Sequence, residues 1–192
     1  MPTVVRSKLF LGFVAVLLAL GMGFGFAQMR GHEHGAHHGH GAGHRHDMGA
    51  MPGLKGRDAT EEESEELAVM FRRFEEISRS VENLPNGIRT VTFAQDEELM
   101  GVVASHVIGM IDRVDEGRDP EVIIQSPTLD ILFERRARIV TEMDMTDEGI
   151  VVIQTSDDPE VVAALQTHAA EVSAMVERGM EAVHEMMAAR ER

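Results

Sequence analysis

Hydrophobic and polar residues follow two different periods along residues 60–117. Between Asp96 and Glu116 apolar side chains recur every three or four positions, which is typical of an amphipathic helix. Between Ile88 and Phe93 two sets of side chains alternate, which is typical of a strand. The pattern therefore predicts, in order, a helix over 60–76, strands over 77–82 and 88–93, and a helix over 96–116.

Local signals support these boundaries. Thr60 and Glu63 have the spacing of a capping box at a helix start. Asn86-Gly87 predicts a tight turn between the two strands, with positive φ angles. Gly117 is expected to end the second helix.

A single shift that places Phe71 on Phe133 superimposes the chain on itself without a gap. The coinciding residues are Phe71 with Phe133, Ile77 with Ile139, Gly87-Ile88 with Gly149-Ile150, Asp96 with Asp158, Glu98 with Glu160, His106 with His168, and Gly117 with Gly179. We interpret this order as an internal duplication. The second copy predicts a short helix over 126–136, strands over 138–143 and 149–154, and a long helix from 157 that continues to 189.

The predicted fold class is α+β. Two tandem αββα repeats, residues 65–117 and 127–179, would form a two-layer sandwich within a single domain of residues 59–192. Its layers are a four-stranded antiparallel sheet and two long helices on one face of that sheet. The alternative is a homodimer in which hairpins of two chains pair.

The segment 1–27 has the pattern of a secretory signal peptide. Arg6 and Lys8 precede an apolar run from Leu9 to Leu20, and small residues lead to a cleavage site after Ala27. We therefore expect a periplasmic or secreted protein. The alternative is an uncleaved segment that anchors the chain in the membrane, because 9–27 is about as long as a bilayer crossing.

Residues 28–58 are predicted to be a disordered, His/Gly-rich tail. Its histidines, separated mostly by Gly and Ala, are His32, His34, His37, His38, His40, His44 and His46. A chain of this composition has no apolar core to bury, and neutral imidazoles bind copper, nickel and zinc. The tail is therefore a candidate metal-capturing segment, and a solubilising linker is the alternative.

Composition narrows the chemistry of the folded part. The 192 residues include no Cys, Trp or Tyr, and the formal net charge is −15. The missing Cys excludes disulfides, thiolate metal sites and covalently attached c-type haem. The acidic balance argues against a nucleic-acid partner.

Two further histidines lie on apolar helical stripes. His106 shares a stripe with Met110, and His168 shares the equivalent stripe with Met175, which follows it in the same helix. Either both are core histidines with internal hydrogen bonds, or the pseudo-symmetry brings them together around one metal ion or non-covalent haem. The methionine thioethers would suit copper or haem iron.

Two segments look familiar: Val81–Thr92, with its Leu-Pro-Asn-Gly turn, and Gln154–Pro159, continuing through His168-Ala169 to Gly179. They resemble an uncharacterised family of small exported bacterial proteins with a duplicated helix-hairpin-helix unit. The resemblance implies export and the repeat, and no activity. Relatives often carry His in the short helix of each unit, whereas residues 71–74 and 133–136 have none here.

The sequence thus favours a non-catalytic transition-metal-binding protein. Its tail would capture the metal, and its domain would hold an ion or dock a periplasmic redox or transport protein. Alternatives are a haem-binding or electron-transfer accessory protein, or a structural interaction module with an incidental tail.

Overall fold

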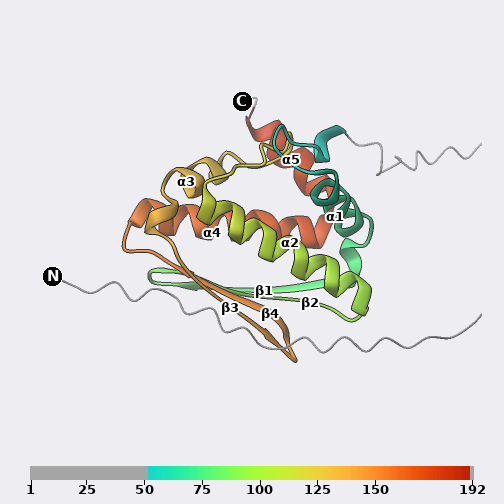
Figure 1. Ribbon diagram of the computed structural model, residues 1–192, viewed down its shortest axis with the longest axis horizontal. Coiled ribbons are helices and arrows are strands. Elements are labelled where there is room, and N and C mark those ends of the chain that lie inside the picture. The colour runs from blue at the N-terminus through green and yellow to red at the C-terminus, as the bar shows by residue number, and fades with distance from the viewer. Residues whose placement is uncertain (1–51, 191–192) are drawn as a thin grey trace, which may run out of the picture. The chain divides into compact units, whose positions relative to one another are not determined.

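The computed structural model describes residues 52–190 (Figure 1). Their elements are η2 (Pro52–Leu54), α1 (Glu61–Arg72), η3 (Phe74–Glu76), β1 (Ile77–Leu84), β2 (Gly87–Ala94), α2 (Glu97–Glu116), α3 (Thr128–Glu134), η4 (Arg136–Arg138), β3 (Val140–Thr146), β4 (Gly149–Thr155), α4 (Pro159–Arg178) and α5 (Met180–Arg190). The predicted α+β class and the predicted four-stranded antiparallel sheet are confirmed. The first predicted helix of each repeat is followed by a 3₁₀ turn, so β3 begins slightly later than expected.

The sheet has the order β1-β2-β4-β3, and every neighbouring pair is antiparallel. Each hairpin therefore contributes one inner and one edge strand. The two hairpins meet along β2 and β4, where Thr90 pairs with Val152.

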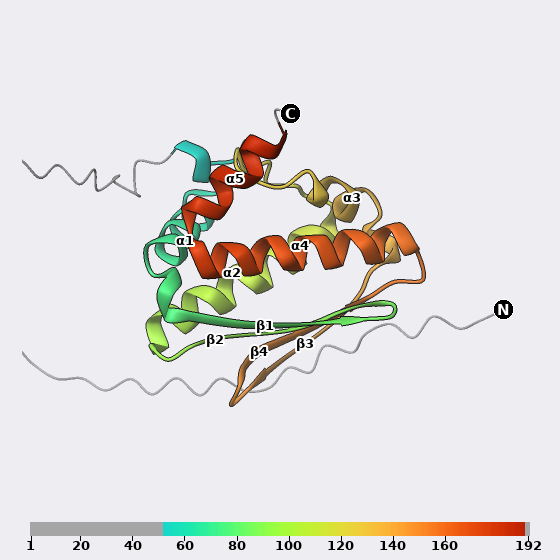
Figure 2. The same cartoon turned by 180° about the vertical axis from the view of Figure 1, so that it is seen from behind.

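Helices α2 and α4 lie along the same face of the sheet (Figure 1). Their contact residues are fully buried, including Leu99 and Val103 on α2 and Val161 and Leu165 on α4. Asp96 and Asp158 cap the two helices by accepting hydrogen bonds from backbone amides of the first turn. Seen from behind, α1, α3 and α5 lie on the side of α2 and α4 that faces away from the sheet (Figure 2).

The β1–β2 turn differs from the prediction. Neither Asn86 nor Gly87 has a positive φ angle, because Gly87 is already paired as the first residue of β2. A Cβ at Gly87 would overlap the carbonyl oxygen of Gln154 on β4. The glycine is therefore needed for close approach of two strands rather than for a left-handed turn.

The predicted single helix over 157–189 is also wrong. α4 ends at Arg178, and Gly179, with φ 55°, turns the chain into the separate helix α5. The turn lets Val183 of α5 become fully buried beside Leu54 and Ala68. Burial of Ala182 and Val183 offsets the loss of helical continuity.

Residues 53–58 take part in the packing, although their sequence places them in the tail. Leu54 is 2 % exposed, and Gly56 forms an isolated β-bridge with Val122. A single Leu among Pro and Gly residues gives too little periodicity to predict this contact.

Candidate functional site

The two predicted histidines line the same cavity. His106 on α2 and His168 on α4 both line an interior space of about 310 Å³ between the helices and the inner face of the sheet. Most of its wall is apolar, and includes Val103 and Ile150. Both helical stripes therefore face this cavity, and the shared ligation of one metal ion or haem by the two imidazoles stays a prediction.

His106 lies in a largely apolar environment. Its side chain is 21 % exposed, and its Nδ1 is 3.8 Å from a carboxylate oxygen of Glu66 on α1. Burial lowers the pKa of His106 to about 4; the Glu63 carboxylate opposes that shift, and the nearby His168 adds to it. The imidazole is therefore neutral at neutral pH and has a lone pair free to bind a metal.

His168 lies one helical turn from Glu171. Its Nδ1 is 3.8 Å from Glu171 Oε2, which is longer than a hydrogen bond, and neither atom has a hydrogen-bond partner. The other Glu171 oxygen accepts hydrogen bonds from the hydroxyls of Ser126 at 2.7 Å and Thr128 at 3.3 Å. Burial raises the pKa of Glu171, but His168 and these hydroxyls outweigh it, so that this pKa lies below its usual value.

Methionine thioethers face the same cavity. Met110 and Met175, which the sequence placed near the two histidines, both belong to its lining, and Met70 on α1 joins them. Within residues 52–190, no three His, Asp or Glu side chains come close enough together to hold a metal ion. A metal in this cavity would therefore need thioethers beside the imidazoles.

Arg79 on β1 is a cavity residue that the helical stripes could not reveal. Its Nη1 donates a hydrogen bond to Thr92 Oγ1 at 2.8 Å, and both residues line the cavity. The alternation of side chains along the strand could have indicated this position, because Ile77, Arg79 and Val81 share the inward face of β1.

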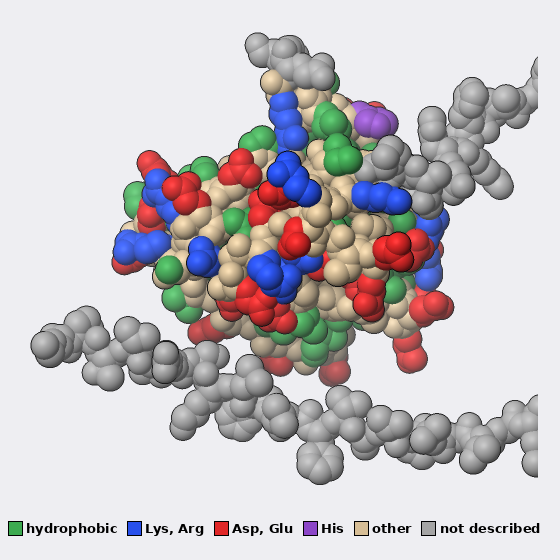
Figure 3. All heavy atoms as spheres, turned by 45° about the horizontal axis from the view of Figure 1, so that its top comes forward, with side chains coloured by type: hydrophobic (Ala, Val, Ile, Leu, Met, Phe, Trp, Pro, Cys, Tyr) green, Lys and Arg blue, Asp and Glu red, His purple; other side chains and the backbone are tan. Residues whose placement is uncertain are grey.

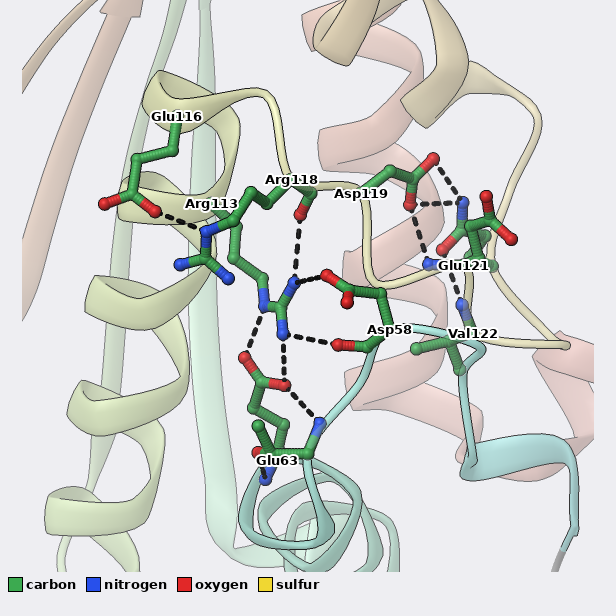
Figure 4. Close-up of polar contacts among 10 residues, drawn as sticks. Asp58, Glu63, Arg113, Glu116, Arg118, Asp119, Glu121 and Val122 are labelled. Carbon is green, nitrogen blue, oxygen red and sulfur yellow. Dashed lines mark hydrogen bonds and ion pairs between the residues drawn. The ribbon is translucent and has the colours of Figure 1, made fainter.

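A second arginine, Arg113, builds a structural network instead (Figure 4). Its guanidinium donates to Glu63 at 2.5 and 2.8 Å, to Asp58 Oδ2 at 3.0 Å, and to the backbone carbonyls of Asp58 and Arg118. Every acceptor belongs to this chain, and the network ties α1 and the segment before it to α2. Arg113 therefore has a structural role, because it holds α1 and the preceding segment against α2.

The surface over the helices carries mixed charge. In Figure 3, acidic and basic side chains are interspersed across this face. The exposed ion pairs of the described residues include Arg178 with Glu185, at 2.5 Å.

Several predictions fall outside the described residues, namely the signal peptide and the seven tail histidines. No helix within residues 52–190 is both long and apolar enough to cross a membrane. Comparison with known protein families, curated proteins and solved structures finds no match to this chain. The functional argument therefore rests on the cavity and its residues.

Proposed function

We propose that this chain is an exported, non-catalytic transition-metal-binding protein whose folded domain holds a single copper(I) ion in the cavity. The observation that carries the proposal is that His106 and His168, at equivalent positions of the two repeats, line one cavity together with Met110 and Met175. Soft thioether ligands favour copper(I), and imidazole completes a small set of uncharged donors.

The electrostatics around the two histidines suits a bound cation. His106 stays neutral because it is buried, and the neighbouring Glu66 and Glu171 carboxylates lie 3.8 Å from the two imidazole Nδ1 atoms. Carboxylates that orient a metal-ligating histidine are a common supporting arrangement. The histidine-rich tail would capture metal outside the domain and pass it to this site.

We further infer that the domain arose by duplication and forms a two-layer sandwich of sheet and long helices. Matching contacts at equivalent positions of the two repeats support the inference. Arg73 pairs with Asp96 at 3.0 Å, and Arg135 pairs with Asp158 at 3.0 Å. A Cβ at Gly149 would strike the carbonyl oxygen of Thr92, which is the counterpart of the Gly87 contact with Gln154.

Non-covalent haem is the second candidate ligand. The largely apolar wall and the two histidines in it favour haem, because haem iron is commonly held by His or by His and Met. A Soret band that appears when haem is added, and disappears when both histidines are replaced, would favour haem over copper.

The test is a copper(I) competition titration on the untagged mature chain, residues 28–192. Three proteins are compared: the parent, a variant with the seven tail histidines replaced by Asn, and a variant carrying His106→Gln and His168→Gln. We expect the tail variant to retain about one tightly bound copper(I), because imidazole and thioether donors inside the cavity suffice to hold it. The double variant should lose that ion.

His184→Gln provides the matched control, because His184 is exposed on α5 and does not line the cavity. Its copper affinity should equal that of the parent. Binding that disappears entirely from the tail variant would reject the cavity site. It would leave the domain as a partner-docking module.

A further inference from the structure

Three buried side-chain atoms within residues 53–190 lack a hydrogen-bond partner, and all three belong to residues that line the cavity. They are Arg79 Nε, His168 Nδ1 and Glu171 Oε2. Buried polar groups are nearly always satisfied, so each of these atoms calls for a polar partner at the cavity. The His168 and Glu171 atoms are 3.8 Å apart and need only a small movement to pair with each other. Arg79 has no such neighbour.

Arg79 is a partly buried cation without an acidic partner, and its Nε atom is fully buried. The ion pairs of the described residues include none with Arg79, and its hydrogen bond to Thr92 is to a neutral hydroxyl. Arg113, by contrast, is enclosed by two carboxylates. Burial lowers the pKa of Arg79 to about 10, but the guanidinium still carries its charge at neutral pH. A charge buried in this way is unfavourable until an anion compensates it.

The shape of the cavity indicates what kind of anion this would be. A guanidinium fork binds a carboxylate through two parallel hydrogen bonds, and the Thr92 hydroxyl can donate a third. The rest of the wall is mostly apolar, with Ile88 and Leu132 among its residues. A volume of about 310 Å³ is near the lower end of small-molecule sites. The ligand is therefore small, with one charged head and an apolar body.

We propose that Arg79 and Thr92 form the head-group site for a small amphipathic carboxylate whose apolar body occupies the cavity between the sheet and helices α2 and α4. The proposal does not depend on the copper site, because neither residue is one of the four proposed metal ligands. It can therefore be tested on metal-free protein, where its failure leaves the copper proposal intact.

The experiment is calorimetric titration of metal-free residues 28–192 with octanoate, octanamide and acetate. Octanamide retains the body without the charge, and acetate retains the charge without the body. We expect octanoate to bind best. Arg79→Gln should weaken octanoate by about tenfold or more and leave octanamide unchanged, because a charged hydrogen-bonded pair is lost.

Arg89→Gln is the matched control, because Arg89 lies on the adjacent strand with its side chain on the opposite face from Thr90 and does not line the cavity. Octanoate should bind this variant as it binds the parent. Thermal unfolding gives a second readout. Without ligand, Arg79→Gln should melt at or above the parent temperature, and octanoate should raise the melting temperature of the parent and the control but not of Arg79→Gln.

Three results would overturn the proposal. They are no octanoate binding to the parent at millimolar concentration, equal binding to the parent and Arg79→Gln, and acetate binding as tightly as octanoate. The last would identify a simple anion site without an apolar subsite. A cavity filled only by water would give the first result.

Discussion

At the scale of single residues, the buried Arg113 and the partly buried Arg79 differ in what surrounds them. Arg113 has a side chain 3 % exposed, and it donates hydrogen bonds to two carboxylates and two backbone carbonyls. Arg79 has one neutral acceptor. Arginine thus stabilises the fold at position 113, whereas at position 79 it is the proposed binding group for an anion.

Replacement of Arg113 by Ala should destabilise the protein by about 1–3 kcal/mol, because the partly buried Glu63 carboxylate loses its charged hydrogen-bond partner. Urea unfolding of the purified chain measures this change. Arg72→Ala is the control, since Arg72 forms a more exposed pair with Glu65 and should cost about 1 kcal/mol or less. Equal losses in the free energy of unfolding for the two variants would contradict the structural role of Arg113.

Glu63 predicts a pH dependence of stability. Hydrogen bonds from Arg113 lower its pKa from 4.5 to about 2, against an opposing effect of burial. Above pH 4.5 the carboxylate is ionised in both folded and unfolded chains, and its stabilisation is fully present. As the pH falls from 4.5 toward 2, the unfolded chain takes up a proton first, so about 3 kcal/mol of stability should be lost.

Urea unfolding between pH 6 and pH 2.5 tests this for the parent and for Glu63→Gln. The variant lacks the ionisable Glu63 carboxylate and its pH-dependent stabilisation. The fall in its free energy of unfolding should therefore be smaller than that of the parent by about the amount that Glu63 contributes. Parallel pH profiles for the two proteins would be the contradicting result.

At the scale of elements, two glycines differ in the space that surrounds them. A Cβ at Gly87 would overlap the β4 backbone, whereas a Cβ at Gly101 on α2 would meet nothing within 4 Å. Gly87→Ala should therefore destabilise the protein by roughly 1–3 kcal/mol through overpacking. Gly101→Ala should stabilise it by roughly 0.5–1 kcal/mol, because Ala is the better helix former.

Thermal and urea unfolding of both alanine variants measure these two changes in stability. Opposite signs would support the tight approach of β2 and β4. A neutral or stabilising Gly87→Ala would mean that the strands can separate at that turn without cost.

Much of the element pattern could be predicted from the sequence, because it depends on local signals. The capping box at Thr60, the helix start at Asp96 and the helix end at Gly117 all occur where the sequence places them, whereas the cap of α4 is Asp158 rather than the predicted Asp157. The break at Gly179 was not predicted, because apolar residues continue past it; the available signal was the equivalence of Gly179 to Gly117, which ends α2. Its cause is tertiary, namely burial of Val183 beside Leu54.

At the scale of the whole molecule, the cavity could be predicted only in part. Helical spacing places His106 and His168 on inward faces, but it gives neither the distance between α2 and α4 nor the position of Arg79 beneath them. The Arg113 network could not follow from the repeat either, because its counterpart in the second copy is Met175. Contacts outside the repeat depend on how the whole chain packs.

The central claim is that copper(I) is bound inside the cavity by imidazole and thioether donors. Copper-edge X-ray absorption of the loaded mature chain tests it most directly. The account predicts nitrogen and sulfur ligands together, unchanged when the seven tail histidines are replaced by Asn. The sulfur contribution should be lost when Met110 and Met175 are replaced by Leu. Nitrogen ligands alone, together with loss of the metal from the tail variant, would contradict the claim.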